Sequence, residues 1–117
     1  MAKHSWVEEF PGAVTVCDSE GVVLEMNESA VRMFEHSGGE KLIGTNILAC
    51  HPEPARSKVK ALLENGRSNV YTIKKKGVKK LIYQSPWYRE GQYGGFVEIS
   101  FEIPDEMPHF DRDKAQD

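Results

Sequence analysis

The chain has 117 residues, 39% of them hydrophobic and 28% charged, and its formal net charge is −3, which is the size and composition of one soluble domain with its own core. The weak negative charge argues against a general affinity for nucleic acid or anionic membranes, and no apolar run approaches the roughly 20 residues that a membrane span needs. The first residues lack the basic-then-apolar order of a secretory signal, so we expect a cytoplasmic protein whose two separate cysteines are reduced.

The N-terminal part predicts two short strands joined by a tight turn. Residues 13–18 (AVTVCD) and 22–26 (VVLEM) are rich in β-branched and other apolar side chains, as short strands are. The DSEG sequence between them suits a type I turn, with Asp18 at its first position and Gly21 at its fourth. The second strand is therefore expected to return beside the first.

The middle of the chain predicts helices. Asn27 is a suitable N-cap for a helix over residues 28–36, and one helical turn is expected over residues 40–43. Pro54 suits the first position of a longer helix, because its missing N–H would have no partner there. Apolar residues recur in this helix at i, i+3 and i+4, and a left-handed Gly66 is expected to end it.

Three further strands are expected after the helices, over about residues 69–75, 78–87 and 95–103. Glycine-containing turns separate them. Two strands before a helical block and three after it predict an α+β fold, in which helices cover one face of an antiparallel sheet.

Basic residues are concentrated between the predicted third and fourth strands. Residues 66–89 contain seven basic side chains and no acidic one, and most of the lysines flank a glycine turn. A patch of this kind fits either an acidic partner or a solvated hairpin tip. The lysine run lacks the interleaved aromatic residues of a nucleic-acid platform, so we favour the solvated tip and expect no nucleic-acid partner.

Three stretches carry a resemblance to a known family. They are PGAVTVCDSEGVVLEMNESAVRMF with its D-x-x-G turn, LIGTN before the long helix, and SPWYREGQYGGFVEISFEIP at the closing hairpin. In this order and spacing they resemble a PAS domain, the sensor module of many bacterial signalling proteins. The resemblance implies a PAS-like five-stranded antiparallel sheet in the order 2-1-5-4-3, helices on one face and a pocket between them. It covers residues 5–104 as a sensor domain, which a polar tail follows at residues 105–117.

Pro86 falls in the fourth strand of that arrangement, between two neighbouring strands. Proline has no N–H to donate to the ladder, so we expect a β-bulge or an interrupted ladder there. Trp87, Tyr88 and Tyr93 cluster at the same hairpin, where they either shield the mouth of the pocket or pack as ordinary edge residues.

The sequence argues against two cofactors that PAS domains carry. Light-oxygen-voltage PAS domains have a reactive cysteine directly after the Asn of a G-x-N-C motif, and the matching stretch here, residues 44–47, has isoleucine in that place. Haem-binding PAS domains usually offer a histidine from within the long helix, which has none here, although His51 lies one turn before it. We therefore expect neither a cysteine–flavin adduct nor haem, and the cofactor is unknown.

Cys50 and His51 are adjacent, and this limits their chemistry. A metal needs three or four converging ligands, whereas neighbours in sequence do not easily reach one ion. A nucleophilic thiol needs a lowered pKa and an oriented base. We therefore expect no catalytic and no metal-binding residue. Two interpretations are left open: the pair lies in a pocket wall or at the entry of a helix, or Cys50 acts as a thiol-based redox switch.

The last strand allows two opposite phases. Strict alternation turns one set of side chains toward the core: Val97, Ile99, Phe101 and Ile103. The PAS resemblance implies the other phase, which turns polar side chains into the pocket: Thr72, Gln84, Glu98 and Ser100. A slip of one residue reverses every side chain, so the two phases exclude each other. We favour the second phase, which leaves the first set on the outer face as an interface.

Under this phase, eight residues are candidates for contact with a ligand: Met33, Asn46, Leu48, His51, Leu63, Ile82, Gln84 and Ser100. We expect a non-catalytic sensory module that binds a small molecule and signals through a protein in trans or a homodimer, without nucleic acid or membrane as a partner. A docking or dimerisation module with a filled core is the alternative, and a redox switch at Cys50 is a third hypothesis.

Overall fold

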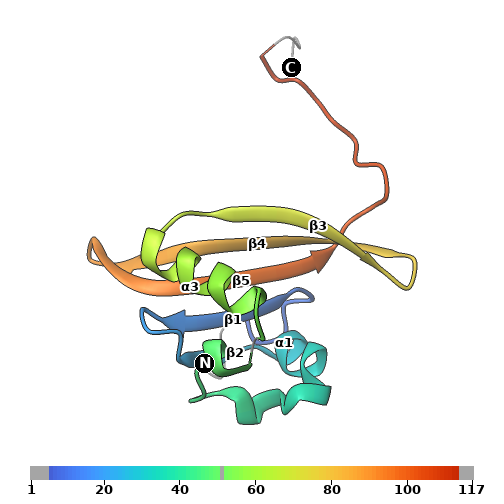
Figure 1. The fold of residues 1–117 in the computed structure, drawn as a ribbon. Coiled ribbons are helices and arrows are strands. Elements are labelled where there is room, and N and C mark those ends of the chain that lie inside the picture. The colour runs from blue at the N-terminus through green and yellow to red at the C-terminus, as the bar shows by residue number, and fades with distance from the viewer. Residues whose placement is uncertain (1–5, 51, 114–117) are drawn as a thin grey trace.

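The computed structural model describes residues 6–50 and 52–113, and of Cys50 it describes only the backbone. One antiparallel sheet of five strands forms its centre, in the order β2-β1-β5-β4-β3 (Figure 1). The strands are β1 (Ala13–Asp18), β2 (Val23–Met26), β3 (Asn69–Lys75), β4 (Val78–Arg89) and β5 (Gln92–Glu102). The predicted α+β class and strand order are confirmed.

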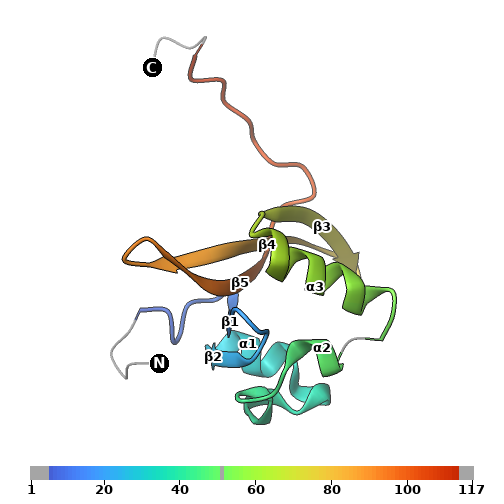
Figure 2. The same cartoon turned by 60° about the vertical axis from the view of Figure 1, so that its left-hand side comes forward.

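The helices lie on one face of this sheet (Figure 2). They are α1 (Glu28–Met33), the 3-10 turns η1 (Glu35–Ser37) and η2 (Gly39–Leu42), the short α2 (Ile47–Cys50) and α3 (Ala55–Asn65). The single helix predicted over residues 28–36 is therefore shorter, because α1 ends at Met33 and the chain tightens into η1. Pro54 is the N-cap of α3, one position earlier than predicted.

The predicted helix caps are present. The Asn27 side chain accepts a hydrogen bond from the Ala30 N–H at 3.0 Å and begins α1. Gly66 ends α3 with φ 61°, and its N–H donates to the Leu62 carbonyl at 3.1 Å. The short helix α2 was not predicted. Its signal is Asn46, whose side chain accepts from the Leu48 N–H at 2.8 Å, as an N-cap does.

The last strand has the second of the two predicted phases. Phe96 and Ser100 are each 4% exposed and lie on the face that the helices cover, with Glu98 between them. The alternate residues, from Val97 to Phe101, are half-buried on the outer face. The helices therefore cover a strand face that includes polar residues.

The inward position predicted for Thr72 is wrong. Thr72 pairs with Leu81, which belongs to the outward set of β4. The inward Gln84 pairs with Asn69 instead. Paired residues on adjacent strands share a face, so the register of β3 with β4 fixes which β3 side chains point inward.

The bulge expected at Pro86 lies one residue further along. The register of β4 with β5 shifts between Trp87 and Tyr88, whereas Pro86 pairs regularly with Phe96. Pro86 also has a neighbouring strand on one side only, because β3 begins at Asn69, opposite Gln84. The expectation that Pro86 lies between two strands is therefore wrong, and an unflanked stretch of strand tolerates proline.

The hydrophobic core lies under β1, β2 and β5, where α1 and α3 meet the sheet. Its buried members are Ala13, Cys17, Val23, Met26, Ala30, Leu63 and Phe96. All residues of β3, in contrast, are exposed. After Ile103, whose N–H donates to the Lys79 carbonyl at 2.9 Å, the described residues form no helix or strand. The boundary at residue 104 stays a prediction.

Candidate functional site

A cavity of about 790 Å³ lies between the helices and the inner face of the sheet. Its roof comes from the helical segments and is mainly apolar, with Phe34, Leu42, Val59 and Leu62 among its residues. Its floor is the sheet. Since β3 is exposed along its whole length, the cavity opens toward that edge, away from the packed core under β1 and β2.

The cavity floor carries a row of polar side chains across four strands. Thr15 on β1 pairs with Glu98 on β5, Glu98 pairs with Gln84 on β4, and Gln84 pairs with Asn69 on β3. All four side chains line the cavity. Such a row forms because directly paired residues of adjacent strands point to the same face.

The amide end of this row is ordered by a hydrogen bond. Asn69 Nδ2 donates to Gln84 Oε1 at 2.9 Å, and Gln84 is 7% exposed. The neighbouring rows are less polar: Cys17 pairs with Phe96 on one side, and Ile82 pairs with Tyr71 on the other. Most polar side chains of the floor thus lie in one line across it.

The electrostatics of the floor follow from burial and from Glu98. Burial raises the pKa of the Cys17 thiol to about 12, with Asp18 and Glu98 adding to the effect. Burial also raises the pKa of Tyr71, and the negative charge of Glu98 raises it further. Both groups therefore stay neutral near neutral pH. Glu98 is the one acidic residue among the described residues that line the cavity.

Three of the predicted ligand-binding residues line this cavity: Met33, Ile82 and Gln84. Leu63 belongs to the buried core, and Leu48 packs against it. Asn46 is engaged locally, because its Nδ2 donates to the Glu20 carbonyl at 3.0 Å. His51 lies outside the described residues, as does the side chain of Cys50.

Ser100 lies beside a second, smaller hollow. This hollow of about 570 Å³ is bordered by the N-terminal segment, α1 and the end of β5, and Met33 lines both hollows. The Ser100 hydroxyl is buried and has no hydrogen-bond partner among the described residues. A buried hydroxyl without a partner is costly, so a bound water or ligand there would stabilise it.

The sequence-based prediction missed Thr15, Asn69 and Tyr71 as cavity residues. Their signal lies in strand pairing: once Gln84 points inward, its partners across the sheet point inward too. Trp87, Tyr88 and Tyr93 do not line the cavity. Trp87 Nε1 donates to the Cys17 carbonyl at 2.8 Å and so joins β4 to β1. The Tyr93 hydroxyl donates to the Leu63 carbonyl at 2.7 Å and so joins β5 to α3.

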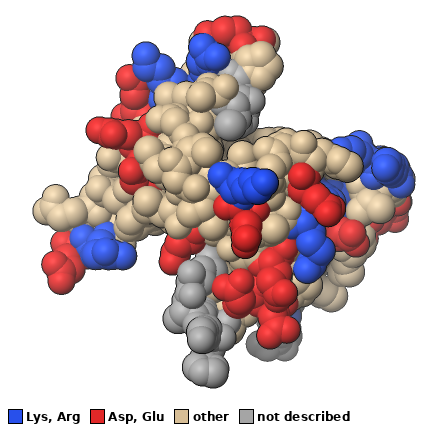
Figure 3. All heavy atoms as spheres, turned by 90° about the horizontal axis from the view of Figure 1, so that it is seen from below, with Lys and Arg blue, Asp and Glu red and all other residues tan. Residues whose placement is uncertain are grey.

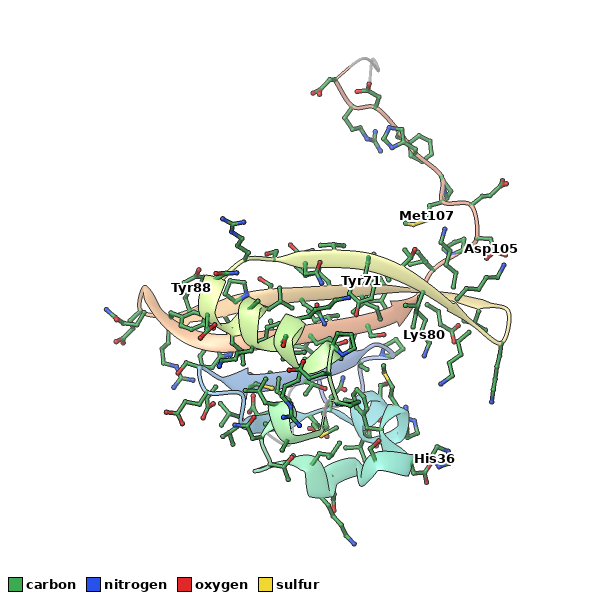
Figure 4. The ribbon with its side chains drawn as sticks, viewed as in Figure 1. His36, Tyr71, Lys80, Tyr88, Asp105 and Met107 are labelled. Atoms are coloured by element: carbon green, nitrogen blue, oxygen red, sulfur yellow. The ribbon has the colours of Figure 1, made fainter. Side chains whose placement is uncertain are left out.

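The described residues, 6–50 and 52–113, contain no group of three His, Cys, Asp or Glu side chains that would hold a metal ion. No histidine among them lines the cavity, and His36 lies on the outer side of the helical layer (Figure 4). Within the same ranges, no helix is long and apolar enough to cross a membrane.

The lysine-rich β3–β4 hairpin projects from one end of the molecule. Basic residues gather at that end in the space-filling view (Figure 3). Lys79 Nζ donates to the Asp105 carbonyl at 3.3 Å, and Lys74 Nζ lies 3.9 Å from Asp105 Oδ1. Exposed pairs of this kind contribute little to stability, and they hold the start of the acidic tail near the hairpin.

The outer face of the sheet is largely apolar. Val97, Ile99 and Phe101 on β5 are half-buried there, and Tyr83 on β4 and Val70 on β3 are 41% and 50% exposed. Tyr83 pairs with both Ile99 and Val70, so the three side chains form one row across this face. A continuous apolar face of this kind marks an interaction surface in many proteins.

The comparisons with known proteins identify the fold. The family model described as the PAS fold matches residues 3–85. The C-terminal domain of a Streptococcus mutans protein is 22% identical and superposes with a TM-score of 0.69, over 83% of this chain and 79% of its own. No curated protein matches this chain by sequence.

Two further solved structures are similar at comparable identity. The PAS domain of BvgS from Bordetella pertussis is 19% identical, with a TM-score of 0.63 over 85% of this chain and 82% of its own. The Aer2 receptor from Vibrio cholerae, described as a dual PAS-haem oxygen sensor, is 19% identical, with a TM-score of 0.57 over 80% of this chain and 95% of its own. At sequence identities this low, the similarity to these structures shows a shared fold.

Proposed function

Because the chain belongs to the PAS fold family, whose members are sensory signalling modules, we propose that it is a non-catalytic sensor that binds a small molecule in the cavity between sheet and helices. The observation that carries this proposal is the polar row on the floor of a mainly apolar cavity. Apolar walls with a few convergent polar groups are typical of small-molecule sites.

The size and openness of the cavity support binding of a ligand. Small-molecule pockets enclose roughly 300–1,000 Å³, and this cavity of about 790 Å³ lies within that range. The alternative of a docking module with a filled core is less favoured, because side chains do not fill this space. Among the similar structures, VqmA was solved bound to DPO and Aer2 is described as a haem sensor, so related folds hold ligands.

The ligand contacts that we propose combine predicted and newly found residues. Met33, Ile82 and Gln84 keep the role predicted from sequence, and Thr15, Asn69, Tyr71 and Glu98 join them on the floor. Leu63 lies in the hydrophobic core with Leu48 packed against it, and Asn46 is hydrogen-bonded locally. The redox hypothesis does not extend to Cys17, because a thiol whose pKa is raised to about 12 is a poor nucleophile at neutral pH.

The outer face of the sheet is the proposed signalling surface, and we assign it to a second copy of the chain. Val97, Ile99, Phe101 and Ile103 lie along it, with Tyr83 and Val70 beside them. Two such faces complement each other because both are apolar. A ligand bound in the cavity acts on this face through β5, because Glu98 and Ser100 alternate along that strand with Val97, Ile99 and Phe101.

Native mass spectrometry of freshly purified protein, with an absorbance scan, tests the ligand proposal. We expect a non-covalent adduct that disappears on denaturation and whose mass narrows the identity of the ligand. A Leu62→Trp variant, which places an indole in the cavity, should lose the adduct, whereas Ala61→Trp on the exposed side of α3 should retain it. Two negative results together would contradict the proposal: wild-type protein that carries no adduct, and a melting temperature of that protein that is the same with and without cell extract.

A further inference from the structure

The second hollow, here called the Ser100 hollow, is separate from the main cavity. It measures about 570 Å³ and lies where the N-terminal segment, α1 and the end of β5 meet. Along β5, Glu98 lines the main cavity, whereas Ser100 and Glu102 line this hollow. Glu98 and Glu102 are four residues apart, which is roughly 13 Å along a strand. Of the described residues that line either space, Met33 alone lines both.

Two basic side chains line the Ser100 hollow, and they come from different elements. Lys80 lies on β4 near the end of the sheet (Figure 4), and Arg32 lies on α1. Lys80 is half-buried, and its ammonium forms no hydrogen bond or ion pair with another described residue. Arg32 Nη2 donates to the Ser29 hydroxyl at 3.4 Å, and this one long bond leaves most of the five guanidinium N–H groups available.

One carboxylate also lines the hollow and opposes these cations. Glu102 is paired with Lys80 in the register, so the two side chains share a face of the sheet. They nevertheless form no ion pair with each other, and Glu102 is exposed to solvent. Solvent screens an exposed charge more strongly than a half-buried one. Two cations against one exposed carboxylate therefore leave the hollow positively charged.

The hydroxyl of Ser100 adds a buried polar group to the same hollow. Ser100 is 4% exposed, and its Oγ has no hydrogen-bond partner among the described residues. Its neighbours across the sheet are Ala13 on β1 and Ile82 on β4, and neither side chain can accept or donate a hydrogen bond. An unpaired buried hydroxyl lowers stability, and a polar ligand atom in the hollow would relieve this cost.

The other walls of the hollow are mainly apolar. Phe10 and Pro11 come from the N-terminal segment, Met33 comes from α1, and Phe101 comes from β5. Apolar walls with a few polar groups favour an organic molecule over a bare inorganic ion, because such a molecule also removes apolar surface from water. The chemistry of the hollow therefore combines a site for negative charge with a site for an apolar body.

From these observations we propose that the Ser100 hollow is a second binding site, which takes a small organic acid. The carboxylate of this ligand accepts hydrogen bonds from Lys80, Arg32 and Ser100, and its apolar body lies against Phe10 and Met33. Hydrogen bonds from guanidinium and ammonium groups to a carboxylate are stronger than those between neutral groups, and the planar guanidinium matches both carboxylate oxygens. This site goes beyond the proposed function, which concerns the main cavity.

Three probes of matched size test the site: 3-phenylpropionate as the anion, 3-phenylpropan-1-ol as the neutral analogue and 3-phenylpropylamine as the cation. Titrations followed by amide chemical shifts in NMR give the dissociation constants and also locate the bound probe. We expect 3-phenylpropionate to bind about tenfold more tightly than the amine, with the alcohol between them. The amide signals of Arg32, Ser100 and Phe101 should shift more than those of Asn69 and Gln84 in the main cavity.

Charge variants with a matched control isolate the two cations. Lys80→Gln should weaken binding of 3-phenylpropionate about fivefold, and adding Arg32→Gln should bring the affinities for the anion and the alcohol to within about twofold. Lys79→Gln removes the same charge from the adjacent residue of β4, which does not line the hollow, and should leave the preference intact. Glu102→Gln should tighten binding of the anion about twofold, because it removes the opposing charge.

Ser100→Ala separates a role in binding from a role in the fold. Without ligand this variant should melt at the same temperature as wild-type protein or higher, because it removes a buried group that has no partner. It should bind 3-phenylpropionate about threefold more weakly. A lower melting temperature, or unchanged affinity for the anion, would overturn the role of this hydroxyl as a ligand contact.

The outcomes separate this site from the proposed function. Equal affinities of wild-type protein for the three probes, tightest binding of the amine, or binding of none of them would overturn the second site, and these results do not depend on how well a variant folds. Shifts confined to Asn69, Gln84 and their neighbours would also overturn it, while they would support the main cavity as a ligand site.

Discussion

At the scale of single residues, Asn27 joins three segments of the chain. Its Oδ1 accepts from the N–H groups of Val14 at 2.9 Å and Ala30 at 3.0 Å. Its Nδ2 donates to the carbonyls of Gly12 at 2.8 Å and Val7 at 2.9 Å. The side chain is fully buried, so water cannot replace these bonds. Asn27 is thus a helix cap and also the link from α1 to β1 and the N-terminal segment.

We predict that Asn27→Ala lowers the free energy of unfolding by about 3 kcal/mol or more, because it removes a cap and all four hydrogen bonds of this buried side chain. Urea denaturation followed by circular dichroism measures the change. The control Asn65→Ala, at an exposed position on α3, should alter stability by less than about 0.5 kcal/mol. A loss below about 1 kcal/mol for Asn27→Ala would show that water fills the gap.

Cys17 should be unreactive in the folded protein. The thiol is 1% exposed, and burial raises its pKa to about 12. In a Cys50→Ser background at about pH 8, we expect iodoacetamide to modify Cys17 only after unfolding, because the thiolate is the nucleophile. Mass spectrometry before and after addition of guanidinium measures this. Rapid alkylation of the folded protein would contradict the burial of this side chain.

The same raised pKa predicts how stability depends on pH. An unfolded thiol ionises near 9.0, whereas the folded one ionises near 12, so between these values the unfolded state holds fewer protons. The contribution of Cys17 to stability is therefore fully present below about pH 9 and decreases as the pH rises toward about 12. The free energy of unfolding should therefore decrease less over this pH range in the Cys17→Ala/Cys50→Ser variant than in the Cys50→Ser variant.

At the scale of elements, the β4–β5 hairpin depends on two adjacent glycines. A Cβ at Gly94 would lie 2.2 Å from the Trp87 ring, so the indole packs where a side chain would be. Gly95 has φ 147°, and a Cβ there would lie 2.2 Å from the Cys17 carbonyl oxygen. The hairpin can therefore approach β1 closely, and Trp87 can donate to the same carbonyl. This closes the end of the sheet beside the cavity.

We predict that Gly95→Ala destabilises the fold by about 3 kcal/mol or more, because both the backbone angle and the contact with β1 exclude a Cβ. Gly91 is the matched control: its φ is 79°, but a Cβ there would meet nothing within 4 Å. Gly91→Ala should cost only about 1 kcal/mol of backbone strain. Equal losses in thermal or urea unfolding would mean that the close approach of β5 to β1 does not matter.

At the scale of the whole molecule, the sheet separates two surfaces of different composition. Its inner face combines a packed core at β1 and β2 with a cavity toward β3. Its outer face is apolar from Val70 through Tyr83 to Ile99. Adjacent residues of β5 alternate between the two faces, so any shift of this strand would move both surfaces together.

We predict that the chain forms a dimer through the outer face and that Ile99→Asp converts it to a monomer, because a carboxylate cannot be buried at an apolar interface without a partner. Size-exclusion chromatography with light scattering measures the mass. Ala61→Asp, exposed on α3 on the opposite side of the sheet, should remain dimeric. Monomeric wild-type protein would instead assign the outer face to a signalling protein in trans.

The sequence by itself determined the local elements of this protein. Residues 13–18 and 69–75 form strands with the predicted bounds, and Asn27 and Gly66 cap helices as their side chains and backbone freedom require. The PAS resemblance supplied the strand order. These features depend on interactions between residues that are close in sequence, or on a topology that a whole family shares.

Only the tertiary structure decided which face of each strand lines the cavity. The stretch from Phe96 to Ile103 alternates polar and apolar side chains, so either set can face the helices, and a slip of one residue exchanges them. The register then brought Thr15, Glu98, Gln84 and Asn69 into one row, although they lie far apart in sequence. Pairing across the sheet is a long-range interaction, and local patterns therefore did not reveal the row or place Thr72 correctly.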